Sequence, residues 1–140
     1  MCYTCVMEMW KSKNRHKYLL QYHIIFVCKY RKKLLMSKQI SDDIKQFSYE
    51  ICQKHKVIIR YIETDKDHIH YMIETEPTMS ISKIVNLMKS YTTYHIWKRY
   101  PDYLRKHFLK EHTFWTDGYF VCSVGNVSEE MLRKYIENQG

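Results

Sequence analysis

The sequence predicts an α+β domain built on one four-stranded antiparallel sheet with two helices on one face. Stretches of strand-like alternation and helix-like periodicity follow one another in the order strand, helix, strand, strand, helix, strand, and a last helix closes the chain. A length of 140 residues is enough for one compact domain with a substantial core. Residues 1–16 show no period, so we expect an N-terminal arm followed by a single domain over residues 17–140.

The first strand and helix are predicted from alternation and from a polar cap. Residues 18–28 alternate with apolar side chains on both faces, which is typical of a central strand. Residues 29–33 form a basic connector. Ser41, followed by Asp42 and Asp43, is expected to begin a helix, because short polar and acidic side chains suit the free amides of a helix start.

The remaining elements follow from β-branched runs, prolines and spacing. Residues 57–63 form a strand that turns through residues 64–67 into a second strand beginning at His68. Pro77 and Ser80 open a helix, Pro101 ends that region, and a short helical turn is expected over residues 103–110. Residues 114–124 form the fourth strand, with Gly118 as a bulge or close approach, and the last helix starts near Ser128. This order is that of a ferredoxin-like (RRM-like) fold.

Two histidines in the third strand are candidate metal ligands. His68 and His70 are two apart, so both leave the same face of the strand, whereas Ile69, Tyr71 and Ile73 face a core. Two neutral imidazoles side by side make up much of a divalent-metal site that leaves positions open for a substrate. Because the two intervening helices cover only one face, the histidines project from the other, where the last helix lies. The alternative is a pair of surface histidines.

A tyrosine and an amide in the last helix are the candidate partners of these histidines. Tyr135 and Gln139 are four apart and therefore expected on one helical stripe. A phenol with a pKa near 10 is a poor nucleophile at neutral pH, but a divalent cation that polarises a phosphate would assist its attack. The product, a phosphotyrosine ester, retains the bond energy needed to rejoin strands without ATP. The alternative is that Tyr135 is a packing residue at helical spacing, together with Met131, Leu132 and Ile136.

Composition indicates a nucleic-acid partner. The formal net charge is +8, from 23 Lys and Arg against 15 Asp and Glu, and aromatic residues make up 15% of the chain. Cations can hold phosphates while aromatic rings stack on unpaired bases. The candidate DNA contacts are Arg31, Lys32, Lys33, Lys83 and Lys89. Each of them could instead be a solubilising surface charge.

Cysteine usage and hydropathy indicate a cytosolic protein. The five cysteines are odd in number and follow no disulfide-scaffold spacing, which favours a reducing compartment. Cys2 and Cys5 have the spacing of half a zinc ribbon, but no second half follows, so we interpret them as thiols. No signal peptide or membrane-spanning segment is expected.

Four segments together resemble a known family. The His-Ile-His motif at residues 68–70, the strand YHIIFV at 22–27 with the KYR tail at 29–31, the strand GYFV at 118–121 and the closing KYIENQ at 134–139 are similar to the single-tyrosine HUH transposases of the insertion sequence 200/605 group (TnpA-like). The similarity runs from about Lys17 to the end of the chain.

The resemblance implies a mechanism and partners. His68, His70 and Gln139 would hold a divalent metal, Mg²⁺ or Mn²⁺, and Tyr135 would attack single-stranded DNA to leave a 5′-phosphotyrosine. The family cleaves and rejoins DNA at insertion-sequence ends, recognises subterminal hairpins, and works as a homodimer in which the partner's tyrosine helix can complete each site. The resemblance also implies a prokaryotic cytoplasmic, nucleoid-associated protein.

Two other functions remain open. A non-catalytic RRM-like nucleic-acid binder would have the same sheet, but the face with His68, His70, Met72 and Glu74 is a poor stacking platform. A HUH nuclease that is domesticated or serves replication or plasmid transfer would keep the same motif, although such proteins are generally larger.

Overall fold

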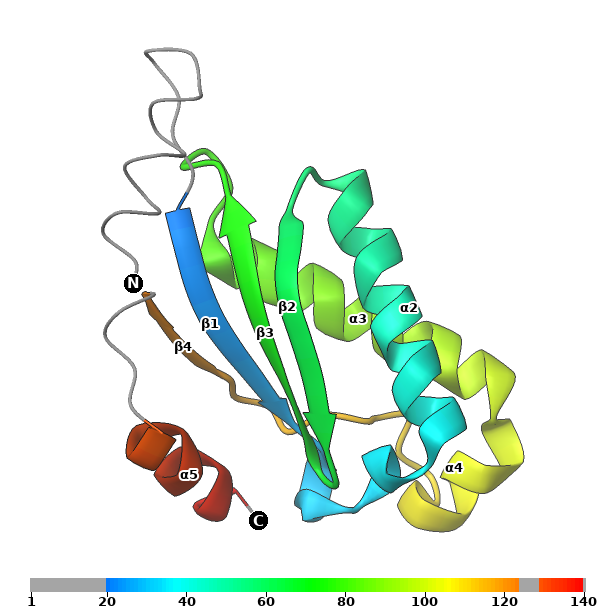
Figure 1. Ribbon diagram of the computed structural model, residues 1–140. Coiled ribbons are helices and arrows are strands. Elements are labelled where there is room, and N and C mark those ends of the chain that lie inside the picture. The colour runs from blue at the N-terminus through cyan, green and yellow to red at the C-terminus, as the bar shows by residue number, and fades with distance from the viewer. Residues whose placement is uncertain (1–19, 124–128, 140) are drawn as a thin grey trace.

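The computed structural model describes residues 20–123 and 129–139, and it confirms the predicted α+β fold (Figure 1). The arm predicted for residues 1–16, with Cys2 and Cys5, lies outside the described residues. The elements are β1 (Leu20–Val27), the 3-10 turns η1 (Lys29–Arg31) and η2 (Leu34–Met36), α2 (Lys38–Lys54), β2 (Ile58–Asp65), β3 (His68–Thr75), α3 (Ile81–Arg99), α4 (Pro101–Phe108), β4 (Phe120–Ser123) and α5 (Glu129–Glu137). Within the described residues, none of these helices is long and apolar enough to cross a membrane.

The sheet has the strand order β2-β3-β1-β4, with every neighbouring pair antiparallel. β1 is a central strand, as predicted, and it pairs with β3 along its whole length, so that Ile25 lies opposite His70 and Val27 opposite His68. Apolar side chains alternate to both faces of β1, and Ile24, Ile25, Phe26 and Val27 are all buried. The register therefore places two buried aliphatic side chains of β1 beside the two histidines of β3.

Helices α2 and α3 cover one face of the sheet and enclose the main core (Figure 1). Ile69, Tyr71 and Ile73 of β3 are fully buried against these helices, as their alternation predicts. The Tyr71 hydroxyl is hydrogen-bonded to the Ser48 hydroxyl at 2.7 Å, and Ser48 also donates to the Ile44 carbonyl of α2 at 2.8 Å. The helices therefore cover this face of the sheet, and the face that carries His68 and His70 is the one available to a ligand.

Helix α2 begins earlier than predicted. Its cap is Ser37, whose Oγ accepts a hydrogen bond from the Ile40 amide at 3.3 Å, and not Ser41. Ser41 lies inside the helix, buried, with its hydroxyl 2.6 Å from the Thr64 hydroxyl of β2. The predicted kind of cap is present, but it is Ser37 and not Ser41. Ser41 is tolerated inside the helix because its hydroxyl has a hydrogen-bond partner on a strand.

Three other boundaries differ from the prediction. Helix α4 starts at Pro101 itself, since proline suits the first helical position, and it ends at Phe108. Strand β2 extends to Asp65, which leaves only residues 66 and 67 for the turn into β3. Strand β4 spans only Phe120–Ser123, and before it Trp115 makes a single bridge to Cys28. Residues 116–119 lie between this bridge and β4, and the carbonyl groups of residues 116–118 are bound by a lysine of α3, described below.

Candidate functional site

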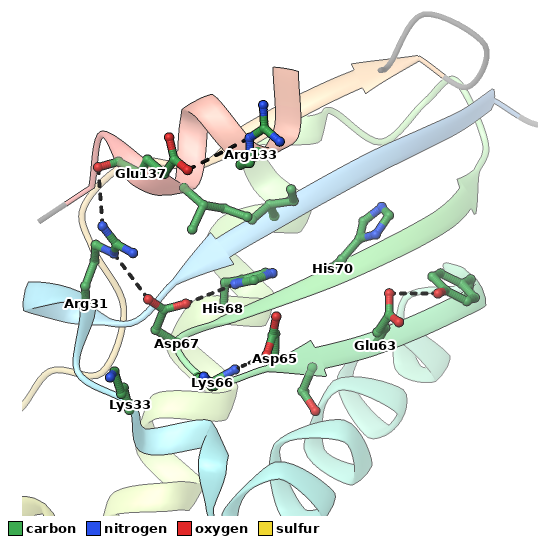
Figure 2. A pocket seen from close by; sticks show the side chains of 14 residues that line it. Arg31, Lys33, Glu63, Asp65, Lys66, Asp67, His68, His70, Arg133 and Glu137 are labelled. Carbon is green, nitrogen blue, oxygen red and sulfur yellow. Dashed lines mark hydrogen bonds and ion pairs between the residues drawn. The ribbon is translucent and has the colours of Figure 1, made fainter. Parts of the chain in front are cut away.

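A cavity of about 840 Å³ opens on the sheet face opposite α2 and α3, and both predicted histidines line it (Figure 2). His68 and His70 project from β3, while Arg133, Ile136 and Glu137 reach the cavity from α5. The other lining residues are Ile25, Arg31, Lys33, Tyr61, Glu63, Thr64, Asp65, Lys66 and Asp67. The expected placement of the histidines on the face next to the last helix is therefore confirmed.

A buried carboxylate fixes the orientation of His68. The Nδ1 atom of His68 lies 3.0 Å from Asp67 Oδ1, and the second oxygen, Oδ2, pairs with Arg31 Nε at 3.2 Å (Figure 2). Burial alone would raise the pKa of Asp67, but hydrogen bonds from His68 and Arg31 outweigh it and the pKa is lowered. Because the carboxylate accepts the Nδ1 proton, the lone pair at Nε2 of His68 is free to bind a metal.

His70 is hydrogen-bonded to a third histidine, His23. Its Nε2 lies 2.8 Å from Nδ1 of His23 on β1, and the two ring centroids are 5.0 Å apart. Burial is the main cause that lowers the pKa of both imidazoles, and for His70 the proximity of His23 adds to the effect while Glu63 opposes it. Both rings are therefore neutral at pH 7, the state that binds metals. Ligation through Nε2 of His70 would replace the hydrogen bond from His23.

The histidine pair fits a metal whose remaining ligands come from other groups. No group of three or more His, Cys, Asp and Glu suited to a metal exists among residues 20–123 and 129–139. Two imidazoles on one face, one with a carboxylate behind it, match an open site that is completed by an amide, water or phosphate oxygen. The residues on β3 thus suit the predicted divalent metal, and they leave room for a substrate.

Gln139, the predicted third ligand, does not share a helical stripe with Tyr135. Helix α5 ends at Glu137, and Gln139 follows it, with its amide donating to the Ile136 carbonyl at 3.1 Å. The same-stripe prediction was wrong because the helix stops before its last turn is complete. Neither Gln139 nor Tyr135 lines the histidine cavity of its own chain.

Tyr135 faces β4 and the segment before it. Its ring centroid lies 5.5 Å from that of Phe120, and a Cβ placed on Gly118 would be 3.9 Å from its hydroxyl. The hydroxyl is buried and lacks a hydrogen-bond partner of good geometry among the described residues. Burial raises the pKa of Tyr135, and the Thr116 side chain partly offsets the shift. The phenol is thus kept protonated. A Cβ at Gly118 would make only an ordinary van der Waals contact with it, and Gly118 lies outside strand β4, so the bulge or close approach predicted there is not found.

Lys89, a predicted DNA contact, holds the segment against which Tyr135 lies. Its Nζ donates to the carbonyl oxygens of Thr116, Asp117 and Gly118 at 2.7, 3.2 and 2.7 Å. The side chain is half-buried, and burial lowers the pKa of its amine. These contacts hold residues 116–118, which precede strand β4. The ammonium group already has three acceptors within the protein. A role of Lys89 in DNA contact stays a prediction.

The other predicted DNA contacts are divided between the two faces of the sheet. Arg31 and Lys33 line the histidine cavity, and Arg31 is engaged with Asp67. Lys32 is half-buried on the same connector, whereas Lys83 is exposed on α3, on the opposite side of the sheet. Contact of these four residues with DNA stays a prediction.

The sequence alone does not single out His23 or Asp67 as site residues. His23 is only part of the first predicted strand, and Asp67 is only part of the turn predicted over residues 64–67. The available signal for Asp67 was its position directly before the His-Ile-His motif, where a carboxylate can reach the first imidazole. The signal for His23 required the register of β1 against β3, which places Ile25 opposite His70 and His23 on the same face.

Comparisons with known proteins find relatives of this chain. A family model described as IS200-like transposase matches residues 16–139. The chain is 26% identical to the ISDra2 transposase TnpA of Deinococcus radiodurans over 95% of this chain and 92% of that protein. It is 28% identical to the transposase for insertion sequence element IS200 of Salmonella typhimurium, over 92% of this chain and 82% of that one.

Two solved structures share the fold. One is the crystal structure of a Deinococcus radiodurans protein assigned as a transposase, with a TM-score of 0.79, 24% identity, and coverage of 87% of this chain and 92% of that one. The other is a REP-associated tyrosine transposase bound to a REP hairpin, with a TM-score of 0.54, 12% identity, and coverage of 86% and 64%.

Proposed function

Because this chain belongs to the IS200-like transposase family, we propose that it cleaves and rejoins single-stranded DNA at insertion-sequence ends through a covalent link to Tyr135. Membership accounts for DNA cleavage and rejoining in general. The observation that supports the particular chemistry is the pair of imidazoles at His68 and His70 in the cavity, with the Asp67 carboxylate behind the first of them. Such a pair beside a tyrosine helix suits phosphoryl transfer to a phenol.

In the proposed cleavage step, the Tyr135 oxygen forms a bond to phosphorus and the bond to the 3′-oxygen breaks. The tyrosine loses its proton, the 3′-oxygen gains one, and the 5′-phosphate stays on the enzyme. A divalent metal, Mg²⁺ or Mn²⁺, held by His68, His70 and Gln139 would supply polarisation of the phosphate oxygen. Attack by a 3′-hydroxyl on the phosphotyrosine reverses these bond changes and rejoins strands without ATP.

The protein's own residues prepare this site for a phosphate. Asp67 accepts from Nδ1 of His68, which leaves Nε2 as the nitrogen that can bind a metal, and burial keeps His70 neutral. Lys33 and Lys66 line the same cavity, where their charges suit a polyanionic strand. Before reaction, burial of the Tyr135 hydroxyl keeps the phenol protonated and away from water.

The nucleophile is proposed to come from the partner copy in a homodimer. In one chain Tyr135 lies against β4 and Gly118 and does not line the cavity of His68 and His70, which supports action in trans. A mixture of Tyr135→Phe with His68→Ala should then recover part of the activity, because one site of each mixed dimer is intact. If mixed dimers, verified by differently tagged subunits, show no activity, the tyrosine acts in cis.

Hairpin DNA is the proposed substrate form. The chain carries a net charge of +8, and a structural neighbour of the same fold is described as bound to a REP hairpin. A hairpin next to a single strand presents clustered phosphates and an unpaired segment, which are what basic and aromatic residues hold.

The test uses end-labelled single strands that contain hairpins, incubated with and without Mg²⁺ or Mn²⁺ and separated on a denaturing gel. We expect a label that stays on the protein only with metal, and that is lost in Tyr135→Phe and strongly reduced in His68→Ala. Tyr119→Phe, which changes a neighbouring tyrosine that precedes β4, is the control and should keep the adduct. An adduct retained in Tyr135→Phe would refute the proposal.

A further inference from the structure

We propose that Arg31 is a positioning residue that couples the docking of helix α5 to the orientation of His68. The inference rests on the proposed function, because it concerns the histidine and the helix assigned there to catalysis. Arg31 was predicted as a DNA contact from its charge and its place in the basic connector. Its contacts in the structure point to a different role.

Arg31 connects three parts of the site (Figure 2). Its Nε pairs with Asp67 Oδ2 at 3.2 Å, and the other oxygen of the same carboxylate lies 3.0 Å from His68 Nδ1. A terminal nitrogen of the same guanidinium donates to the Glu137 carbonyl at 3.4 Å. The planar guanidinium has five N–H donors in a fixed fork, so it can bind a carboxylate along one edge and a carbonyl along another.

The carbonyl that Arg31 binds is at the end of α5. Glu137 is the last residue of this helix, where carbonyl groups have no partner within the helix and the macrodipole is negative. A cation there stabilises the docked helix. The carboxylate on the opposite side is buried, with a side-chain exposure of 12% against 40% for Arg31, so its charge needs a close partner.

The backbone at this point is strained in a way that serves these contacts. Tyr30 and Arg31 have φ angles of 61° and 52°, the left-handed region that non-glycine residues rarely occupy, and they do so consecutively. The conformation is held by the amide of Arg31, which donates to the Cys28 carbonyl at 2.8 Å, and by the amide of Cys28, which donates to the Asp67 carbonyl at 2.8 Å. Strain that the surroundings maintain is typical of functional positions. Here it places the guanidinium between Asp67 and α5.

The arrangement predicts reciprocal linkage. When α5 is docked, Arg31 is held against Asp67, and Asp67 in turn holds His68 with Nε2 ready for a metal. A metal on His68 therefore favours the docked helix, and the docked helix favours metal binding by the same factor. Displacement of α5, as when its tyrosine serves another subunit, would loosen the histidine in the chain that it leaves.

The experiment measures Mn²⁺ affinity by electron paramagnetic resonance and amide exchange of α5 by mass spectrometry, both on the full chain without DNA. Arg31→Lys keeps the charge but lacks the fork, and Lys33→Gln removes a cavity-lining charge two residues away as the matched control. We expect Arg31→Lys to weaken Mn²⁺ binding about tenfold, the lower end of losses typical for groups behind a ligand. The control should bind Mn²⁺ within about twofold of the wild type, inside that limit.

Amide exchange tests the coupling itself. Mn²⁺ should slow exchange in residues 130–138 of the wild type and of Lys33→Gln, and it should have no such effect in Arg31→Lys. The wild-type result needs no variant to fold, so a misfolded Arg31→Lys does not remove the test. The inference would be overturned if Mn²⁺ does not change amide exchange of α5 in the wild type, or if Arg31→Lys binds Mn²⁺ with wild-type affinity.

The two proposals fail differently. Suppose that the wild type forms the Tyr135 adduct with Mn²⁺, but Mn²⁺ does not change amide exchange in α5 and Arg31→Lys binds Mn²⁺ with wild-type affinity. That result leaves the proposed function standing and refutes only the coupling. A wild type that binds no Mn²⁺ refutes both. If Arg31 instead contacts phosphate, Arg31→Lys should weaken hairpin binding through loss of the guanidinium fork and leave Mn²⁺ affinity unchanged, which also refutes the coupling.

Discussion

Replacement of Lys89 by methionine separates a structural role from a DNA contact. The ammonium group donates to three consecutive carbonyls, of Thr116, Asp117 and Gly118, and these residues form the wall beside the Tyr135 hydroxyl. The ammonium nitrogen also lies 5.4 Å from the ring centroid of Phe26 and 5.8 Å from that of Tyr119. Methionine keeps most of the aliphatic stem, so Lys89→Met removes the three hydrogen bonds and these two cation–π contacts while it retains much of the side-chain volume.

The expected loss of stability follows from these contacts. A hydrogen bond to a charged group contributes about 1.5–3 kcal/mol. Two of the three bonds are solvent-exposed, so water can replace the lysine there, and the losses do not add. We expect Lys89→Met to lower the free energy of unfolding by about 2 kcal/mol, which for a domain of this size is a fall in Tm of about 6 °C. Adduct formation should fall with it, because the wall beside Tyr135 loosens.

Thermal melts and hairpin binding at several salt concentrations check the prediction. Lys83→Met, exposed on the same helix, is the control and should change stability by less than about 0.5 kcal/mol. If Lys89 binds phosphate instead, Lys89→Met should keep the wild-type Tm while DNA affinity falls and its slope against salt decreases by about one. That pattern would refute the structural role.

Three further predictions follow from burial and from the proposed metal. The pKa values of His23 and His70 are lowered in the folded state, so below about pH 6.5 the unfolded chain binds more protons than the folded chain. The free energy of unfolding without metal should therefore fall from pH 7 to pH 5, which urea titrations in the presence of a chelator measure. If His23→Gln leaves the dependence of this free energy on pH unchanged, the prediction is contradicted. Ser48→Ala strands the buried Tyr71 hydroxyl and should cost about 1–3 kcal/mol, whereas exposed Ser90→Ala should cost almost nothing; equal urea midpoints for the two variants would be inconsistent with this. Chelation of divalent ions should abolish the covalent adduct while gel shifts still show bound hairpin DNA, and an adduct that survives chelator would exclude metal dependence.

The fold and the face of the site could be predicted because they depend on local periodicity. Alternation along β3 sends Ile69, Tyr71 and Ile73 to the helices and His68 and His70 to the other face, whatever the neighbouring strands are. The element order then fixes how many helices are available to cover the sheet. Both inferences use only residues close together in sequence, and both are confirmed.

The network around the site could not be predicted because its contacts are long-range. His23 and His70 are 47 residues apart in sequence, and Arg31 and Asp67 are 36 apart, so each pair depends on strand register and on a strained turn. A lysine on a helix surface looks the same in sequence whether it meets phosphate or, like Lys89, backbone carbonyls.

Element ends were missed for a related reason. Ser37 and Ser41 are both acceptable caps, and only the partner of the second one, Thr64 on a different strand, distinguishes them. Gln139 lies four residues after Tyr135, but α5 ends at Glu137, and the sequence holds no strong signal for the end of the helix there. Same-stripe arguments are reliable only within a helix.

The most direct test of the account is to identify which residue carries the DNA. The wild type would be reacted with a hairpin-bearing single strand and Mg²⁺, digested with nuclease and protease, and the residue that retains a nucleotide located by tandem mass spectrometry. We predict a 5′-phosphonucleotide on Tyr135. A nucleotide on Tyr61 would contradict the account, since that tyrosine lines the histidine cavity with its ring centroid 5.7 Å from that of His70.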